Sequence, residues 1–562
     1  MISPQQYLEN LVKKAARKLT AKLPHFEMES KNISRFGDYS SNVAFSLAKI
    51  LKKSPIEIAR KIKSDLEENR YLDKIEIAGG GFINFFFKKD FWLEMFKNPL
   101  AKINPGKGKK VIIDYSSPNI AKPMHVGHLR ATLIGDFLAR LYKFLDFKVI
   151  GWNHLGDWGT QFGMLIAGYK KWGDKKKINK EPIRELLEIY VRFNREIKNN
   201  PRLLKQAQEE FAKLERQDKE NKKILNWFLR VSLKEFNQLY KKLGILPFSV
   251  VKGESEYEKQ LIPLINDLKN KGVAILSQGA YIIPLEKYSL PPALVQKSDG
   301  ATLYLTREIA SLIYRVKKYQ PDEILYVIGS QQNLHLKQLF AIAQIAGLSG
   351  KAKLRHVSFG WVLGPNGKKL ATREGEIIEA QKIVDQIINT ARKIVSQKRK
   401  DLSKKEKEKI ARIVGLGGLK YNFLKDGRNS DIVFDPKKAL SLQGNSAPYL
   451  QYTYVRLKSI LAKTKTGKGD FSLFEDKDIE IIKKLTAFED VLENCLKDSS
   501  SHHLAEYLFG LANLANNFYE TTPILKDKNI KRRNARLALI KAAAGNLETG
   551  LELMGIETLN RI

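Results

Sequence analysis

Two histidines separated by a small residue and a glycine form the part of this chain best suited to chemistry on a phosphate. His125 and His128 flank Gly127 where a loop enters a helical pattern. Helix N-termini present free N–H groups and a partial positive charge, and imidazoles can donate hydrogen bonds to phosphate oxygens. The pattern therefore predicts a nucleotide site. It favours a metal site less, since no third metal ligand of matching type lies nearby. The alternatives are a metal site or two histidines that only cap a helix.

A second candidate for phosphate binding is the glycine-bounded segment 363–376 (LGPNGKKLATREGE). Its cations Lys368, Lys369 and Arg373 could close over a triphosphate, with the glycines as hinges. Charge alone would equally suit a solvated surface turn. The histidine segment far upstream favours the phosphate interpretation.

The elements that position these residues can be predicted from hydrophobic patterns. Residues 111–115 (VIIDY) suit a buried parallel strand. Apolar residues spaced three or four apart predict a helix over 128–147. Strand, loop and helix in this order open a nucleotide-binding α/β fold. Further strand-like runs lie at 280–285, 301–306 and 323–328.

The predicted fold class is α/β, with three domains. Residues 1–105 form a small α/β domain, with helices over 3–22 and 40–67 and a strand pair in 74–87. Residues 106–385 form a Rossmann-like parallel-sheet domain that a charged, helical insertion interrupts at about 168–295. Residues 386–562 form an all-helical domain.

Composition limits the class of protein. The 562 residues include 98 Lys+Arg and 61 Asp+Glu, a formal net charge of +37, which suits nucleic acid or an anionic membrane surface. About half of the excess is expected to be surface lysine bias. With 43% hydrophobic residues the chain is not disordered, and its one cysteine, Cys495, excludes an internal disulfide and a cysteine-rich zinc site. No apolar run is long enough for a membrane span.

The histidine segment resembles the HxGH signature of class I aminoacyl-tRNA synthetases. The longer strings SSPNIAKPMHVGHLRATLIGD (116–136) and NHLGDWGTQFGMLI (153–166) resemble the arginyl-tRNA synthetase family in particular. The resemblance implies an arginine–tRNA ligase, which joins arginine to ATP as an adenylate and then transfers it to the 3′ end of tRNA(Arg).

The basic segment resembles the KMSKS loop of this class. It departs from the family's pattern at Leu370 and Ala371 and has Thr372 in place of the second lysine, a role that Lys122 is thought to fill in this family. The catalytic residues implied by the resemblance are His125, His128, Lys122 and Lys369. The implied ATP-binding residues are Pro118, Met124, His125, Gly127, His128, Lys368, Lys369 and Arg373.

The resemblance also implies an arginine site. A guanidinium group needs carboxylates and other acceptors. The matching positions are Asp114, Ser116, Asn119, Tyr304, Glu308 and Gln332. Tyr304 and Glu308 are four apart and share a face if helical; Glu308 replaces a more usual Asp.

Contacts with tRNA are implied near both ends of the chain. In the family's N-terminal domain, Phe36 and Asp38 fall in a stretch that meets the tRNA elbow. In the helical domain, Tyr449, Tyr452 and Arg456 suit stacking on unpaired bases, although at least one tyrosine of 449, 452 and 454 is expected in the core. Basic stretches at 170–180, 398–409 and 526–541 are candidate phosphate contacts.

The implied partners are tRNA(Arg), L-arginine and ATP accompanied by Mg²⁺, with no zinc, no all-protein metal site and no membrane. A cytoplasmic monomer is expected. The alternatives are another class I synthetase, a small-molecule nucleotidyltransferase and a non-catalytic tRNA-binding paralogue. A cysteinyl enzyme would need thiolates for zinc, which one cysteine does not supply.

Overall fold

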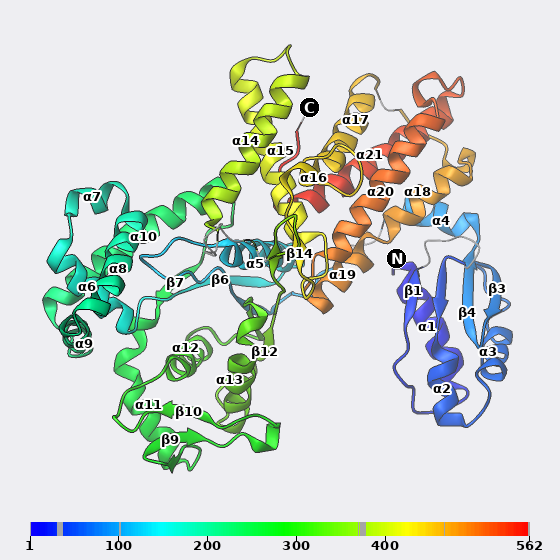
Figure 1. The fold of residues 1–562 in the computed structure, drawn as a ribbon. Helices are drawn as coiled ribbons and strands as arrows, with labels where there is room; N and C mark the ends of the chain where they lie inside the picture. Colours follow the sequence, from blue (N-terminus) through cyan, green and yellow to red (C-terminus); the bar gives the residue numbers. More distant parts are fainter. Residues whose placement is uncertain are drawn as a thin grey trace.

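The structure, a computed structural model, describes residues 2–30, 37–99, 103–368, 370, 378–465 and 467–559. Figure 1 shows an N-terminal unit in blue, a central sheet with its helices in cyan to green, and helices of the C-terminal part in yellow to red. The fold is α/β with a parallel-sheet domain and a helical C-terminal part, as predicted. The domain boundaries at 105 and 385 stay predictions.

The N-terminal unit is a four-stranded antiparallel sheet, in the order β1-β2-β4-β3, with helices packed on it. The predicted strand pair is the hairpin β3–β4, and it buries Ile83 and Phe85. The helical pattern over 40–67 is two helices, because Pro55 cannot continue the first and instead begins the second. The elements are α1 (Pro4–Arg17), β1 (Met28–Ser30), β2 (Tyr39–Ser41), α2 (Val43–Leu51), α3 (Pro55–Ser64), β3 (Leu72–Ala78), β4 (Phe82–Phe87) and α4 (Lys89–Lys97).

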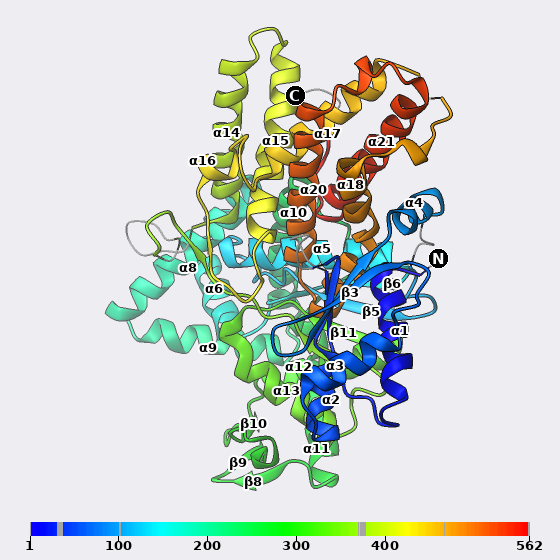
Figure 2. The ribbon, with the colours of Figure 1, turned by 90° about the vertical axis from the view of Figure 1, so that its right-hand side faces the viewer.

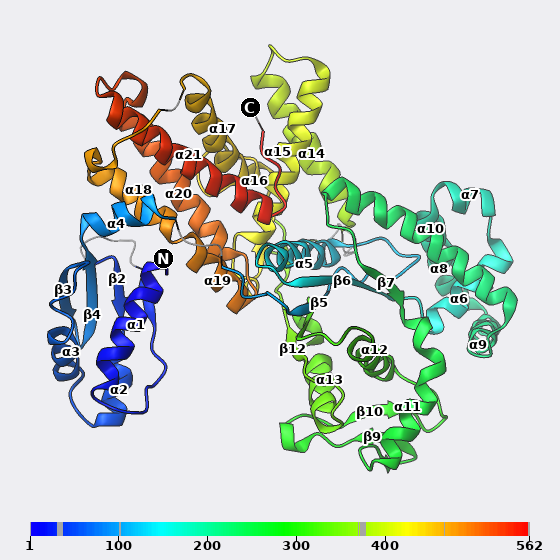
Figure 3. The same ribbon diagram turned by 180° about the vertical axis from the view of Figure 1, so that it is seen from behind.

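The central sheet has five parallel strands in the order β12-β11-β5-β6-β7. β5 lies in the middle, and Val111, Ile112 and Ile113 are fully buried, as expected for a parallel strand covered on both faces. Helix α5 (Val126–Phe144) follows β5 and lies beside the sheet (Figure 3). The strands are β5 (Lys110–Asp114), β6 (Lys148–Leu155), β7 (Val250–Gly253), β11 (Glu323–Tyr326) and β12 (Lys353–His356).

Two insertions leave the sheet, on either side of β7. The first is helical and projects to the left in Figure 1: α6 (Thr160–Trp172), α7 (Lys175–Lys180), α8 (Pro182–Asn199), α9 (Arg202–Glu215) and α10 (Lys219–Leu243). The second comprises η2 (Glu254–Tyr257), α11 (Glu258–Asn270) and an antiparallel sheet of β8 (Ile275–Ser277), β9 (Ala280–Ile283) and β10 (Ala293–Gln296). The strand predicted at 280–285 therefore contains β9, outside the parallel sheet.

The strand predicted at 301–306 is wrong, because helix α12 (Tyr304–Tyr319) begins inside it. Its β-branched and aromatic residues form the first turn of a helix whose inner face is buried against the sheet, so tertiary packing outweighs strand propensity. The chain returns to the sheet in β11, and η4 (Ser330–Gln332) and α13 (Asn333–Ile345) follow.

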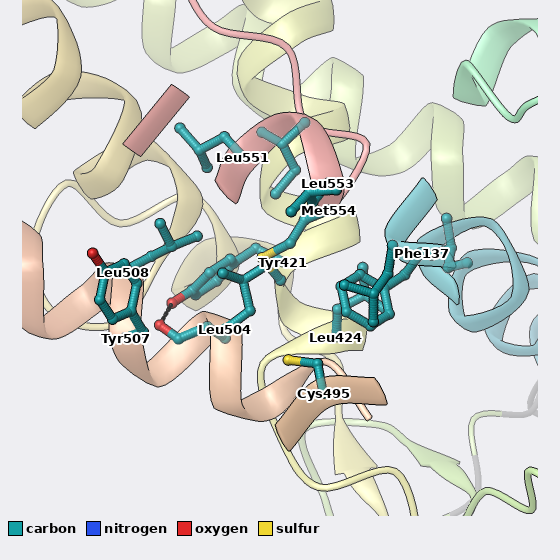
Figure 4. Packing of buried hydrophobic residues seen from close by; sticks show 14 of the residues in the cluster. Phe137, Tyr421, Leu424, Cys495, Leu504, Tyr507, Leu508, Leu551, Leu553 and Met554 are labelled. Atoms are coloured by element: carbon teal, nitrogen blue, oxygen red, sulfur yellow. Dashed lines mark hydrogen bonds between the residues drawn. The ribbon is translucent and has the colours of Figure 1, made fainter. Parts of the chain in front are cut away.

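The C-terminal part is a set of packed helices (Figure 2), and its described residues include one short strand pair. Its core continues into the parallel-sheet domain: Phe137 of α5 packs with Tyr421, Leu424 and the buried Cys495 (Figure 4). The elements are β13 (Val362–Leu363), α14 (Ala380–Lys398), α15 (Lys404–Leu424), β14 (Ile432–Val433), α16 (Pro436–Ala439), α17 (Ala447–Ala462), η5 (Phe471–Leu473), α18 (Asp476–Thr486), α19 (Phe488–Asp498), α20 (His502–Thr521), η6 (Ile524–Lys526) and α21 (Ile530–Leu553). In the described ranges, no helix is long and apolar enough to cross a membrane.

Candidate active site

The strand order places the site between the carboxyl ends of β5 and β11. From β5 the chain proceeds to β6 and β7 on one side, and later to β11 and β12 on the other. Open α/β sheets bind ligands in the crevice where the strand order reverses in this way. Asp114 and Tyr326, the last residues of β5 and β11, lie opposite each other in register.

The loop after β5 carries three non-glycine residues in left-handed backbone conformations. Their φ angles are 74° at Ser116, 46° at Ser117 and 59° at Ala121, and each such conformation costs about 1–3 kcal/mol. Hydrogen bonds hold the loop: the Ser117 N–H donates to Asn153 Oδ1 at 3.1 Å, and Ser117 Oγ donates to Asp114 Oδ1 at 3.0 Å. The loop is thus fixed to β6 as well as to its own strand.

The insertion helix α10 supplies two further anchors. The Ala121 N–H donates to Ser232 Oγ at 3.0 Å, and the Tyr240 hydroxyl lies 2.6 Å from Ser116 Oγ. Thr132 of α5 also donates to Ser116 Oγ, at 2.9 Å. The insertion therefore supports the loop, and the Ser116 hydroxyl is engaged within the protein.

His125 and His128 lie in the first turn of α5, with ring centroids 3.8 Å apart. His125 Nδ1 accepts from the Gly127 N–H at 3.0 Å, and His128 Nδ1 accepts from the His125 N–H at 3.2 Å. Each neutral ring therefore carries its proton on Nε2. Burial lowers the pKa of His125; burial and the neighbouring His125 lower the pKa of His128 to about 3. Both are neutral Nε2–H donors at neutral pH.

Three predicted ATP-binding residues lie around this histidine pair. A Cβ at Gly127 would come within 2.9 Å of His125 Cε1, so glycine permits the close packing of the imidazole. Pro118 and Met124 are buried in the loop. Lys122 is partly buried, and its Nζ lies 4.6 Å from the centroid of the Tyr190 ring on α8.

The end of the predicted basic loop is paired with the histidine segment. The Val126 N–H donates to the Ile378 carbonyl at 3.1 Å, and the Ala380 N–H donates to the Met124 carbonyl at 2.7 Å. The residues that leave this loop thus lie against the start of α5.

The start of the same loop is tied to α5 as well. The guanidinium of buried Arg130 donates to the Trp361 carbonyl at 2.9 Å, just before β13. Lys368 is exposed in the turn that follows. Lys369 and Arg373 lie outside the described residues, so their predicted roles stay predictions.

Asp114 and Glu308 are buried, and each is already paired within the protein. Asp114 Oδ2 lies 2.7 Å from Arg315 Nη2, and Glu308 Oε1 lies 3.2 Å from His154 Nε2. Burial opposes the charge on Glu308, but the nearby His154 and Arg315 outweigh it and lower its pKa to about 2. Glu308 therefore stays ionised at neutral pH. Asp114, Arg315, His154 and Glu308 together form one buried group of side chains, the carboxylate cluster.

Of the other predicted arginine ligands, Tyr304 lies next to the carboxylate cluster. Tyr304 begins α12 one turn before Glu308, and its ring centroid lies 4.7 Å from that of His335. Burial and the Glu308 carboxylate raise the pKa of the Tyr304 phenol. Gln332 is exposed at the end of η4, and Asn119 is exposed on the loop after β5. A Cβ on Gly156 would lie 1.9 Å from Asn119 Oδ1, so this glycine makes room for the amide.

An exposed aromatic and cationic stack lies on the C-terminal helices. The guanidinium carbon of Arg456 lies 4.8 Å from the ring centroids of both Tyr452 and Tyr519, which are 40% and 43% exposed. Tyr449 donates its hydroxyl to Asn513 at 2.8 Å. Tyr454 is buried, which confirms that at least one of the three tyrosines at 449, 452 and 454 belongs to the core.

The predicted contact at the other end of the chain is partly internal. Asp38 Oδ2 accepts from the Phe87 N–H at 2.8 Å, and its other oxygen lies 2.8 Å from Lys483 Nζ on α18. Asp38 thus joins the N-terminal unit to the C-terminal helices, and its contact with tRNA stays a prediction. Phe36 lies outside the described residues.

Several residues of the site have no signal in the sequence patterns. Arg315 and Tyr240 lie in amphipathic helices, where a polar residue on the inner side looks like any surface residue. Tyr519 is likewise one aromatic residue in a long helix. His154 falls inside the string NHLGDWG, but only the packing of α12 against β6 shows its carboxylate partner.

Comparison with protein families covers most of the chain. The family described as "tRNA synthetases class I (R), catalytic domain" matches residues 95–436. The "Arginyl tRNA synthetase N terminal domain" matches residues 6–87, and the "DALR anticodon binding domain" matches residues 450–562.

Individual relatives agree over nearly the whole length. The chain is 39% identical to an arginine–tRNA ligase of Halothermothrix orenii over 99% of both chains, and 38% identical to one of Clostridioides difficile over 94% of both. Its fold matches arginyl-tRNA synthetase structures from Plasmodium falciparum (26% identity) and Thermus thermophilus (23% identity), each with a TM-score of 0.85 and full coverage of both chains. The chain therefore belongs to the arginyl-tRNA synthetase family, the class I arginine–tRNA ligases.

Proposed function

We propose that the chain charges tRNA(Arg) with arginine in two steps. The carboxylate of arginine attacks the α-phosphate of ATP, giving arginyl-adenylate and diphosphate. The terminal ribose hydroxyl of the tRNA then takes the arginyl group, and AMP leaves. The observation that supports this most strongly is the pair of Nε2–H donors of His125 and His128 at the start of α5, together with the buried carboxylates of Asp114 and Glu308.

The phosphate chemistry in this proposal depends on positioning and on stabilisation of charge. His125 and His128 donate from Nε2 to oxygens of the α-phosphate region as negative charge develops, and need no change of protonation. Lys122 and Lys369 neutralise charge on the leaving diphosphate. The residues that hold ATP are the two histidines and two lysines just named, together with Pro118, Met124, Gly127, Lys368 and Arg373.

The proposed arginine site uses the buried carboxylates for the guanidinium. Asp114 and Glu308 accept its N–H groups, and the Tyr304 hydroxyl adjoins them. Asn119 and Gln332, on the loops after β5 and β11, hold the amino-acid end. The Ser116 hydroxyl shapes the loop between them through Tyr240 and Thr132.

The remaining partners are proposed as follows. No cluster of three or more His, Cys, Asp or Glu side chains that could hold a metal occurs in the part of the chain that the structure describes. Independently of this, Mg²⁺ is proposed to accompany the phosphates of ATP. The tRNA elbow meets the N-terminal unit at Phe36 and Asp38, and the anticodon arm meets Tyr449, Tyr452 and Arg456. The enzyme acts as a monomer in the cytoplasm.

The reaction is tested by ATP–diphosphate exchange with each amino acid in turn, with and without tRNA(Arg). Exchange that depends on arginine, and charging of tRNA(Arg) with arginine alone, are expected. Exchange that proceeds without arginine would contradict the proposed substrate. Binding of tRNA with no exchange under any condition would instead favour a non-catalytic paralogue.

A further inference from the structure

The strongest feature that the proposed reaction does not use is the buried His154. It lies on β6, its side chain is 5% exposed, and its Nε2 is 3.2 Å from Glu308 Oε1. Neither ring nitrogen has a partner with hydrogen-bond geometry among the described residues, so the contact with Glu308 is an ion-pair contact. The imidazole therefore occupies a direction from which Glu308 could accept a hydrogen bond from a ligand.

A second ion pair, Arg315 with Asp114, completes the charges of the carboxylate cluster. Arg315 and Asp114 are both almost fully buried and 2.7 Å apart, and the Arg315 guanidinium also lies 4.7 Å from the Trp152 ring. With His154 protonated, the two carboxylates and two cations sum to zero. A guanidinium that joins this cluster adds one positive charge in a place where burial makes an unbalanced charge expensive.

The two cations of the carboxylate cluster, Arg315 and His154, differ in whether they can release a proton. Arg315 keeps its proton in any protein environment, whereas a histidine can release one near neutral pH. Among the described residues, the groups that face His154 are Glu308, Arg315 and Tyr304 of α12, Asp114 of β5, Asp157 after β6, Glu254 and Tyr257 of η2, and His335 of α13 through Glu308. Of these, Glu254 could also change its protonation, because burial raises its pKa to about 7, whereas burial lowers the pKa of His335 and keeps that ring neutral near neutral pH.

We propose that His154 is a proton-releasing counter-ion of the arginine site, whose imidazolium pairs with Glu308 until the substrate guanidinium replaces it. On binding, the ion pair between His154 Nε2 and Glu308 separates, a guanidinium N–H bonds to the carboxylate, and the imidazolium gives one proton to the solvent. The carboxylate cluster, with the bound guanidinium counted, keeps two negative and two positive charges throughout. This inference rests on the proposed arginine site.

The direction of the pH effect follows from the two states. Burial alone would lower the pKa of His154, but the Glu308 carboxylate outweighs it, and the pKa is raised in the free protein. Once a guanidinium holds Glu308, that support is lost and the pKa falls. Arginine binding is therefore expected to strengthen as pH rises through this window, by up to about tenfold per pH unit, and to level off above the pKa of the free state.

Calorimetric titration of the full chain with L-arginine, in the presence of tRNA(Arg) and without ATP, measures the proton directly. The same titration in buffers of different ionisation enthalpy is expected to show a net release approaching one proton per arginine at a pH below the free-state pKa. Arginine binding with the same heat in every buffer would overturn the inference while leaving the proposed function intact. Absence of any arginine binding would contradict the proposed function itself.

Two variants identify the group that releases the proton. His154→Gln keeps a hydrogen-bond donor toward Glu308 without a charge, so it is expected to abolish the release and to flatten the pH dependence of KM for arginine while kcat changes less. Glu254→Gln is the matched control and is expected to retain the release. Release that persists in His154→Gln and disappears in Glu254→Gln would overturn the assignment. If His154→Gln does not fold, the wild-type buffer series still decides between release and no release.

Discussion

The histidine pair shows how one residue can serve both the local fold and the chemistry. The Nδ1 atoms of His125 and His128 accept backbone N–H groups in the first turn of α5. This capping leaves both Nε2–H groups for a ligand, at the end of a helix that already favours anions. Their lowered pKa values keep the rings neutral, so their donor role does not depend on pH near neutrality.

Replacement of His128 tests this double role. His128→Ala is expected to lower the rate of arginine-dependent exchange by ~10²-fold or more, since one preorganised donor to the developing charge is lost. The free energy of unfolding should fall by only about 1 kcal/mol, the usual cost of a lost cap. Exchange kinetics and urea unfolding measure the two effects.

The control is His25→Ala, which removes an exposed histidine from the N-terminal unit. It should leave both quantities unchanged. Near-full activity of His128→Ala would remove His128 from the phosphate site.

Much of this site could be predicted from the sequence because its residues lie close together in the chain. The HxGH spacing, the strand before it and the helix after it are local patterns, and they predict the strand β5 and the helix α5 between which His125 lies. The partner of Glu308 could not be predicted in the same way. His154 and Glu308 meet only because α12 packs over β6, and no spacing along the chain encodes that contact.

At the scale of elements, Arg130 joins α5 to the segments that lead into and follow the basic loop. Its guanidinium donates to the carbonyls of Trp361, Arg428 and Ser430 at 2.9, 3.2 and 2.8 Å. Although burial lowers its pKa to about 10, the group stays charged at neutral pH. Helix α5 therefore carries the two histidines and, through Arg130, also anchors the start of the loop.

Arg130→Met should therefore affect both stability and catalysis. Removal of three buried hydrogen bonds is expected to cost about 3 kcal/mol of unfolding free energy. KM for ATP should rise because the loop loses its anchor to α5. Arg130→Lys keeps the charge but not the fork of donors. Its free energy of unfolding and its KM for ATP should lie between those of the wild type and Arg130→Met. An unchanged KM for ATP in Arg130→Met would show that the anchor does not position the loop.

The crossing of α5 over β5 depends on the absence of one Cβ. A Cβ at Gly135 would lie 2.2 Å from Tyr115 Cγ and 2.3 Å from Tyr115 Cβ, atoms that cannot move without the strand. Gly135→Ala is expected to cost about 1–3 kcal/mol through overpacking. Gly545→Ala is the matched control: this exposed glycine of α21 has no atom within 4 Å of an added Cβ, so alanine should stabilise the helix by up to about 1 kcal/mol. Denaturant unfolding of both variants measures the contrast, and equal effects would contradict the packing argument.

At the scale of the whole molecule, the net charge of +37 has an uneven distribution. In the predicted phosphate contact at 526–541, Arg536 is buried and pairs with Asp478, and Arg532 pairs with Asp527. That stretch is thus partly neutralised from within. In the turn between α14 and α15 and the first two turns of α15, by contrast, Lys400, Lys404, Lys405 and Lys409 are exposed, and no ion pair of theirs is found among the described residues. Sequence composition predicts the total charge, but only the fold shows which part is free.

This difference predicts how tRNA binding responds to salt. Each phosphate contact contributes about 0.7–0.9 to the slope of log K against log salt. Replacement of those four exposed lysines by Gln should lower the slope by up to about 3.

Arg532→Gln, the control, should destabilise α21 slightly and leave the slope unchanged, because its charge is already held by Asp527 and Glu475. Filter-binding titrations over a salt series measure both slopes, and arginine binding measured in parallel should change little with salt. A flat response of the wild type would show that the excess charge serves solubility, and an unchanged slope in the lysine variant would place the tRNA contacts elsewhere.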